Sequence, residues 1–194
     1  MKRRGFTLVE LLIVIVVIGI LAAMMMLSST ESVSSAKATK IISDLTVLKK
    51  AVTSWYIDNY DRVVKQYDSS RKRDEYLVKV GNSAYHLGVF AKDHKGEKEF
   101  VKYLGSSVKI KLTKDNSTEP GEYLLATEGD QWFVGYDVGD DMRLREKIAA
   151  RAKQNHLLAA DKQTNKDGSL GVNTDNIHAY SELDRKVYML ILQF

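Results

Sequence analysis

The sequence predicts an α+β fold, in which one long N-terminal helix packs on an antiparallel β-sheet. Three observations lead to this prediction. Residues 6–60 carry apolar side chains at helical spacing and contain no proline. Residues 108–138 contain segments with the alternation typical of strands, two of them separated by a turn sequence. Residues 187–192 form a last apolar segment, which is expected to add a buried strand to the same sheet.

The first half of the long helix, residues 6–27, is predicted to span a membrane. This run is apolar apart from Glu10, and about 20 such residues suffice to cross the hydrocarbon core of a bilayer. Lys2, Arg3 and Arg4 precede the run, and positive charge at this place favours a cytoplasmic N-terminus. Everything after about Ser28 is therefore expected on the other side of the membrane.

The second half of the helix, residues 28–60, is predicted to be amphipathic. Its charged and polar residues lie on the side opposite to an apolar stripe, which is expected to cover the sheet. The stripe consists of Ala38, Ile41, Ile42, Leu45, Leu48, Val52, Trp55 and Tyr56.

The globular part, residues 61–194, is predicted to combine short strands with two further helices. Residues 71–73, a basic cluster, are expected in a solvated loop because acidic residues surround them. Glu128-Gly129-Asp130 is expected to form a hairpin turn. The other expected elements are a loop or helix extension at 61–79 that ends in a strand at 76–80, strands at 85–90, 108–112, 122–127 and 131–138, and a helix at 98–104.

A second long helix is predicted to begin at Asp140 and Asp141 and to run to about Ala160. Acidic side chains stabilise the N-terminal end of a helix, where the backbone dipole is positive. A polar loop is expected over residues 161–176, before the final strand.

Composition excludes several classes of protein. The chain has 194 residues and no cysteine, so disulfides and thiolate metal sites are excluded. The net charge is +4, and removing Lys2, Arg3 and Arg4 subtracts three positive charges, which leaves +1. The basic balance therefore gives no evidence for a nucleic-acid surface. A charged solvent face accounts equally well for Lys109, Lys111 and Lys114, so a nucleic-acid partner is not expected.

No motif for an enzyme is found in the sequence. A phosphate loop, a dinucleotide fingerprint, a nucleophile elbow and a zinc-protease helix are all missing, and the four histidines are scattered. We therefore expect no catalytic residues and no cofactor. One weak metal candidate is a calcium loop at Asp161, Asn165 and Asp167, which together with Gln163 recur at every second position before Gly168. Plain turn chemistry explains the same residues, because the interleaved lysines disfavour a cation and the Glu of an EF-hand is not at its spacing.

Glu10 is the unexpected residue of the apolar run. A carboxylate inside a membrane helix costs free energy, so it is a candidate functional residue. Two simpler interpretations remain open: Glu10 lies at the membrane interface, or the whole stretch is an ordinary secretory signal with a cleavage zone at Ala22-Ala23.

The string Gly5-Phe6-Thr7-Leu8-Val9-Glu10 with its apolar continuation resembles the prepilin signature of the type IV pilin family, which includes the pseudopilins of type II secretion and competence systems. The resemblance covers the leader and the first helix. It implies that residues 1–5 are a leader peptide, that a prepilin peptidase cuts between Gly5 and Phe6, and that the new amino group of Phe6 is methylated. It also implies that Glu10 meets the Phe6 amino group of a neighbouring subunit. Many family members have a proline where this chain has Leu27.

The sequence and this resemblance together predict a structural subunit of a type IV pilus or pilus-like filament. The implied partners are prepilin peptidase, further copies of the chain in a helical filament, other pilin-like subunits, an inner-membrane assembly platform, and the lipid bilayer before assembly. The alternatives are a type II secretion or competence pseudopilin and, from a different class, an anchored or secreted binding domain with an ordinary signal sequence.

Overall fold

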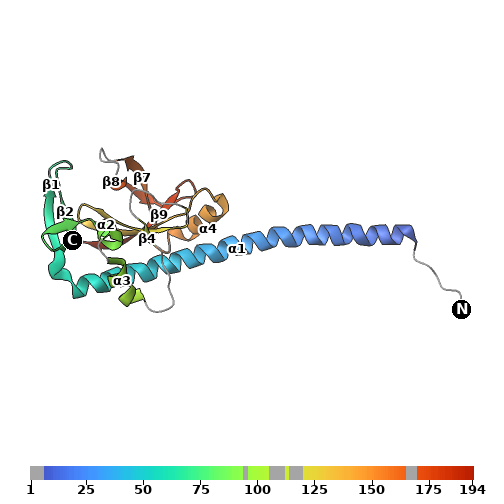
Figure 1. Ribbon diagram of the computed structural model, residues 1–194. Helices are drawn as coiled ribbons and strands as arrows, with labels where there is room; N and C mark the ends of the chain where they lie inside the picture. Colours follow the sequence, from blue (N-terminus) through green and yellow to red (C-terminus); the bar gives the residue numbers. More distant parts are fainter. Residues whose placement is uncertain (1–6, 94–95, 105–111, 114–119, 165–169) are drawn as a thin grey trace.

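The computed structural model describes residues 7–93, 96–104, 112–113, 120–164 and 170–194. A single long helix extends from a globular domain, and only its C-terminal half contacts that domain (Figure 1). The α+β layout expected from the sequence is confirmed.

The long helix, α1, spans Leu8–Asp58 in 51 residues, two residues shorter at each end than predicted. The predicted apolar stripe of its second half is buried against the domain, apart from Tyr56, which is half-buried. Helix α1 ends where the Asn59 side chain donates a hydrogen bond to the Trp55 carbonyl oxygen at 2.9 Å. No interruption occurs at Leu27, which agrees with the missing proline.

A small antiparallel sheet follows α1, at the end of the domain farthest from the projecting half of the helix (Figure 1). It follows a 3-10 turn, η1 (Tyr60–Arg62), and consists of β1 (Val63–Asp68), β2 (Arg73–Val80) and β3 (Ser83–Tyr85). The strand expected at 76–80 is confirmed within β2, whereas the loop or helix extension expected before it was wrong, since β1 and the start of β2 form a hairpin there. Asp68 closes the turn by accepting hydrogen bonds from the Ser70 and Arg71 amides, at 2.8 and 3.3 Å.

Two short helices come next, α2 (Leu87–Asp93) and α3 (Gly96–Leu104). Helix α3 confirms the expected helix at 98–104, whereas the strand expected at 85–90 was wrong. Residues 87, 90 and 91 are buried at helical spacing, so α2 has one apolar face toward the core. The Leu87 amide donates to the Thr127 hydroxyl oxygen at 2.9 Å, which fixes the start of this helix on the sheet.

The main sheet has six strands in the order β4-β5-β6-β9-β7-β8. The predicted hairpin is confirmed, and the last strand lies inside the sheet, antiparallel to β6. Of the strand expected at 108–112, only residue 112 lies within the described residues. The strands are β4 (Leu112–Thr113), β5 (Tyr123–Glu128), β6 (Gln131–Asp137), β7 (Leu158–Thr164), β8 (Leu170–Ala179) and β9 (Lys186–Gln193).

Helix α4 spans Met142–Ala152 and begins as predicted, with the Asp141 carboxylate accepting the Leu144 amide at 3.1 Å. It ends about eight residues earlier than expected. The Leu157 amide donates to the Ala152 carbonyl oxygen at 3.0 Å, and His156 between them has a φ of 51°. This is the geometry of a Schellman C-cap, in which glycine usually takes the left-handed position.

Residues 161–176 were predicted as a polar loop, and this was wrong for the described part. Strands β7 and β8 pair with each other there, with a register irregularity between Ala160 and Lys162. This hairpin supplies Leu158 and Ile177 to a second, smaller core, which contains Leu124, Phe133 and Tyr188 on the sheet face opposite to α1. Strands β5 and β6 are therefore covered on both faces, which explains why all of β5 is buried.

The basic cluster at residues 71–73 is only partly solvated, contrary to the prediction. Arg71 donates to Glu75 at 2.7 Å, and Arg73 pairs with Glu128, while both carboxylates belong to residues that are 3% exposed. Only Lys72 at the tip of the hairpin is exposed. The cluster therefore fastens the small sheet to the β5–β6 hairpin.

Candidate functional site

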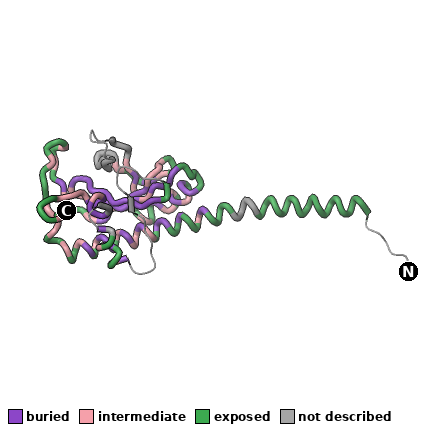
Figure 2. Tube along the Cα trace, in the orientation of Figure 1, coloured by how far each residue is buried: buried purple, intermediate pink, exposed green. Residues whose placement is uncertain are grey.

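The projecting half of α1 is the largest apolar surface of the described chain. Large apolar side chains from Leu8 to Met25 are between 48% and 80% exposed, and no part of the globular domain covers them. Figure 2 shows this half as exposed along its described length, whereas buried positions begin where α1 reaches the domain. Monomeric soluble proteins do not expose apolar patches of this size, so this half requires a lipid or protein environment.

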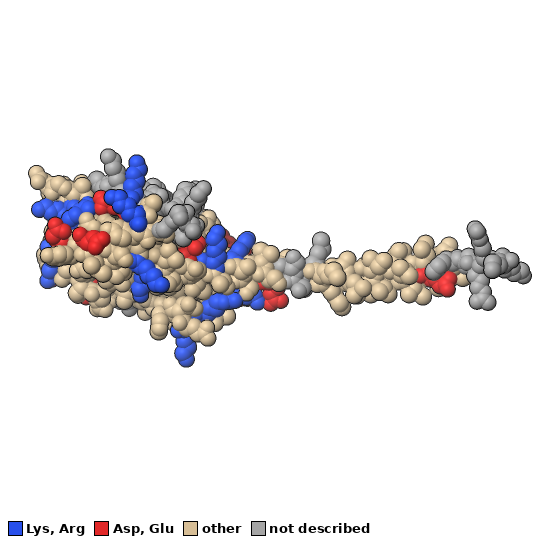
Figure 3. All heavy atoms as spheres, turned by 90° about the horizontal axis from the view of Figure 1, so that it is seen from below, with Lys and Arg blue, Asp and Glu red and all other residues tan. Residues whose placement is uncertain are grey.

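Charge is almost missing from the same half. Between Thr7 and Thr30 the only charged residue is Glu10. Lys, Arg, Asp and Glu gather instead on the globular domain (Figure 3). By its length and composition, α1 could cross a membrane, and it is the one such helix among the described residues.

Glu10 lies in the first turn of α1 and binds Thr7 of its own chain. The Glu10 Oε2 atom accepts hydrogen bonds from the Thr7 amide at 2.8 Å and from the Thr7 hydroxyl at 2.9 Å. In return, the Glu10 amide donates to the Thr7 hydroxyl oxygen at 3.3 Å. These contacts form a capping box, which satisfies backbone donors that the first turn of a helix leaves unpaired.

The capping box gives Glu10 a role that the sequence interpretation missed. The signal was present, because Thr followed three residues later by Glu, at the start of an apolar run, is the capping-box pattern. The box also reduces the cost of placing the carboxylate near a membrane, since its charge is hydrogen-bonded. Both hydrogen bonds that Glu10 accepts from Thr7 use Oε2, so the capping box engages one of the two carboxylate oxygens.

Most of the other predicted site residues lie outside the part of the chain that the structure describes. Gly5 and Phe6, the predicted cleavage pair, lie outside the described residues. Asn165 and Asp167 also lie outside them, and Asp161 is described only as part of the backbone of β7. The calcium candidate therefore stays a prediction. Elsewhere, among the residues that the structure does describe, no group of three acidic or histidine side chains could hold a metal ion.

Helix α4 holds α1 directly beyond the projecting half. Three basic residues at four-residue spacing on α4 contact polar residues of α1. Arg143 donates to Thr30 at 3.2 Å, Lys147 to Glu31 at 2.7 Å, and Arg151 to Ser35 at 2.8 Å. The hydrogen bond from Lys147 lowers the pKa of the Glu31 carboxyl.

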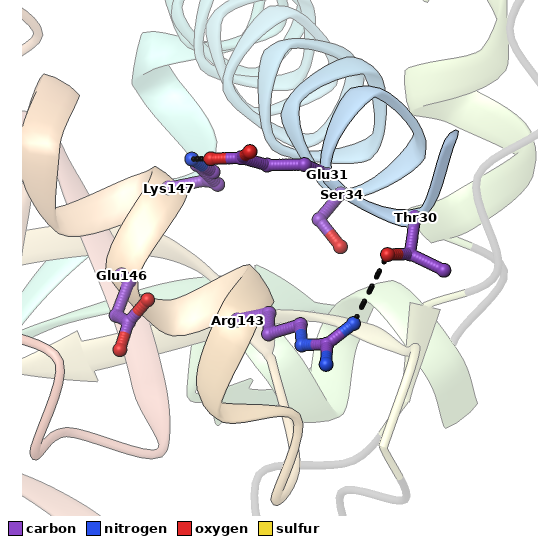
Figure 4. Close-up of a pocket in the computed structure, with 6 residues that line it drawn as sticks. All are labelled: Thr30, Glu31, Ser34, Arg143, Glu146 and Lys147. Carbon is purple, nitrogen blue, oxygen red and sulfur yellow. Dashed lines mark hydrogen bonds and ion pairs between the residues drawn. The ribbon is translucent and has the colours of Figure 1, made fainter. Parts of the chain in front are cut away.

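These α4–α1 contacts enclose a pocket of about 230 Å³. Its lining residues are Thr30, Glu31, Ser34, Arg143, Glu146 and Lys147. Figure 4 shows Ser34 of α1 and Arg143 of α4 pointing into the space between the two helices.

A further contact fixes α1 to the middle of the sheet. The Tyr123 hydroxyl of β5 donates to the Asp44 carboxylate of α1 at 2.7 Å. Burial and this hydrogen bond raise the pKa of Tyr123, so the phenol stays protonated and remains a donor. The second half of α1 is thus held on the domain by its apolar stripe and by polar contacts with both α4 and β5.

Taken together, the fold is a compact α+β domain on a helix whose free half is compatible with anchoring in a membrane. Residues 1–26 match the family described as the prokaryotic N-terminal methylation motif, which is the cleavage and methylation motif of type IV prepilin-like proteins. This match supports a type IV pilin-like or pseudopilin protein. No curated protein and no solved structure matches the chain.

Proposed function

We propose that this chain is a structural subunit of a type IV pilus or pilus-like filament and has no catalytic activity of its own. The observation that carries the proposal is the exposed apolar half of α1, which continues directly from the methylation motif. Helices of this kind can lie in a bilayer before assembly and pack against copies of themselves afterwards. The globular domain leaves that half of the helix free for both environments.

The proposed mechanism has three steps. The precursor first lies in the inner membrane with Lys2, Arg3 and Arg4 on the cytoplasmic side. Prepilin peptidase then cuts between Gly5 and Phe6, and the new amino group is methylated. An inner-membrane assembly platform finally withdraws the subunit, and helix–helix contacts replace contacts with lipid.

Glu10 supplies the contact that sets the axial position of neighbouring subunits in this proposal. An α-amino group has a reference pKa of about 7.7–8.0, so the Phe6 amine carries a positive charge at neutral pH. A buried carboxylate is tolerated when an opposite charge is hydrogen-bonded to it. The hydrogen bonds to Thr7 stabilise Glu10 until the amine of a neighbouring subunit replaces or supplements them.

Mass spectrometry of the mature N-terminus tests this function. The expected result is a chain that begins at methylated Phe6. A chain that begins near Ser28 would instead support the alternative of a secreted binding domain with an ordinary signal sequence. A chain that keeps residues 1–5 in a host with an active prepilin peptidase would also contradict the proposal.

The second candidate is a pseudopilin of a type II secretion or competence system. Its helix would be processed and assembled in the same way, so the N-terminus does not separate the two. The neighbouring genes do, since a secretion or competence operon favours the pseudopilin and a pilus operon favours the pilin.

A further inference from the structure

The pocket between α1 and α4 lies at the height of the lipid headgroups if the projecting half of α1 spans the membrane, as the proposed function requires. The headgroup layer is about 5–8 Å thick on each side of the hydrocarbon core. With a rise of 1.5 Å per residue, Thr30 and Ser34 lie about 4.5 Å and about 10 Å beyond Leu27, the predicted end of the span. The pocket therefore begins inside the headgroup layer.

The lining of the pocket includes groups that bind a phosphate. The Arg143 guanidinium carries five N–H donors, and one of its two Nη groups donates to the Thr30 hydroxyl of α1. Ser34 is 9% exposed and its hydroxyl points into the pocket (Figure 4). Arginine and hydroxyl groups together are typical of phosphate sites.

The same pocket also offers a carboxylate for a positive group. Glu31 is already paired with Lys147 at 2.7 Å. Glu146, by contrast, makes no ion pair or hydrogen bond among the described residues, although it lines the pocket. The charges of Arg143 and Lys147 cancel those of Glu31 and Glu146, so the pocket does not select a purely anionic ligand. Arg143 and Glu146, a cation and an anion three residues apart on α4, instead match a ligand that carries both a negative and a positive group.

We propose that this pocket binds the headgroup of a zwitterionic phospholipid with a primary amine, such as phosphatidylethanolamine, while the subunit lies in the membrane. Arg143 and Ser34 hold the phosphate, and Glu146 accepts hydrogen bonds from the ammonium group. The volume of about 230 Å³ is far above the ~10–15 Å³ that one water molecule needs. The bound lipid fixes the height and rotation of the globular domain on the bilayer before the subunit is withdrawn.

Native mass spectrometry of the full chain in detergent tests the proposal, with phosphatidylethanolamine, phosphatidylcholine and phosphatidylglycerol added in turn. Phosphatidylethanolamine should be retained best, because phosphatidylcholine has no N–H donor for Glu146 and phosphatidylglycerol has no amine. Arg143→Gln should weaken its retention about tenfold, since hydrogen bonds to charged groups are among the strong ones. Glu146→Gln should remove the preference over phosphatidylglycerol.

Arg151→Gln is the matched control. Arg151 lies on the same face of α4 and also donates to a serine of α1, but it does not line the pocket. This variant should retain phosphatidylethanolamine like the unchanged chain. Circular dichroism melting of all variants checks that they fold, which is expected because Arg143 and Glu146 are exposed.

Several results would overturn the proposal. Equal retention of the three lipids, or equal losses in Arg143→Gln and Arg151→Gln, would show that the pocket does not select a headgroup. Retention of water-soluble phosphoethanolamine as tightly as of the lipid would point to a free phosphate ligand. A chain dimer in place of bound lipid would assign the pocket to contacts between copies. A chain that does not enter detergent or membrane at all would contradict the proposed function as well, and so is distinguishable from the others.

Discussion

Thr7 and Glu10 begin α1 as a pair, and both residues of this pair belong to the same chain. The N-terminus of the helix is capped by residues of its own chain. The hydroxyl of Thr7 donates a hydrogen bond to the Glu10 carboxylate and accepts one from the Glu10 amide. In the proposed filament, Glu10 would therefore have two roles that compete for one carboxylate: it caps its own helix, and it would pair with the amine of a neighbouring subunit.

Replacing Thr7 by valine removes the hydroxyl but keeps the branched shape of the side chain. We expect the amides of residues 10 and 11 to exchange their hydrogens about fivefold faster, because losing an N-cap side chain costs on the order of 1 kcal/mol. Hydrogen exchange of the chain in detergent micelles measures this effect. Thr7→Ser keeps the hydroxyl and should exchange like the unchanged chain, and equal rates in all three would show that the capping box does not stabilise the helix.

His156 is the second residue with a backbone role that its side chain does not reveal. It is exposed and has a φ of 51°. The left-handed conformation costs an L-residue roughly 1–2 kcal/mol, whereas glycine adopts it without that cost.

His156→Gly should therefore stabilise the chain by about 1 kcal/mol and raise the melting temperature by about 2–4 °C. Thermal unfolding followed by circular dichroism gives the comparison. His156→Ala is the control, since alanine removes the imidazole but keeps the strained conformation, and it should show no such gain. A lower melting temperature for the glycine variant would mean that the imidazole itself stabilises the C-cap.

At the scale of elements, α1, η1 and α3 are joined at one carboxylate. Glu99 of α3 accepts hydrogen bonds from the Trp55 indole and from the Arg62 guanidinium, both at 2.8 Å. The Trp55 ring in turn contacts Phe90 and Phe100 at centroid distances of 5.2 and 5.3 Å. The end of α1 that carries the domain thus depends on one acidic side chain.

Glu99 gives the stability of this junction a defined pH dependence. Burial tends to raise the pKa of Glu99, but the hydrogen bonds from Arg62 and Trp55 outweigh burial and lower it below the ordinary value of 4.5. Because the folded chain binds this proton less readily than the unfolded chain, the stabilisation is present above about pH 4.5 and is lost as the pH falls through the lowered pKa.

Glu99→Gln should destabilise the chain by about 1 kcal/mol at pH 7, and the difference from the unchanged chain should shrink below pH 4.5. Urea unfolding at several pH values measures both. Glu146→Gln, which changes a carboxylate without a described ion pair, should have little effect at either pH. A constant difference across the pH range would exclude the carboxylate charge as its cause.

The elements that were predicted correctly carry a clear local signal in the sequence. The second half of α1 repeats its apolar residues at helical spacing, and the β5–β6 hairpin has Gly129 at φ 59° in its turn. The wrong predictions lie where the sequence shows no such local signal. Helix α2 has only seven residues, too few to show a period. Strands β7 and β8 are largely polar in sequence, and α4 ends shortly before His156, which takes the left-handed conformation typical of glycine.

The candidate site was predictable to a different degree in each part. Glu10 and the apolar half of α1 stand out in the sequence alone, since a lone carboxylate in a long apolar run is unusual. The contacts of Arg143, Lys147 and Arg151 with α1 join residues more than 100 positions apart. No local pattern specifies such pairs, because they depend on how α4 packs on α1.

At the scale of the whole molecule, the described part of the apolar half of α1 makes no contact with the globular domain. Substitutions in this half should therefore change assembly without unfolding the domain. Glu10→Ala is expected to leave the precursor in the membrane and to reduce the yield of filaments, because the substitution removes the carboxylate that is proposed to pair with the Phe6 amine of a neighbouring subunit. Electron microscopy and quantification of sheared filaments measure the yield, and normal yield would count directly against the proposed pairing.

Two further variants separate the roles of Glu10. Glu10→Gln can still cap the helix through its amide oxygen but carries no charge, so a reduced yield would assign the effect to pairing and a normal yield to capping. Glu31→Ala removes the first described carboxylate beyond the predicted span and should leave assembly near normal.

The unbroken course of α1 also fixes the rotational phase between its two halves. Each residue turns an α-helix by about 100°, so one inserted residue between positions 27 and 34 would rotate the whole apolar half by that angle relative to the domain and shift it by about 1.5 Å. Ser34 is buried against the domain while Val33 beside it is exposed, so the domain is sensitive to this angle. The length of the segment between the two halves therefore matters independently of its side chains. Among short insertions, those of about 7 or about 11 residues would come nearest to restoring the original facing.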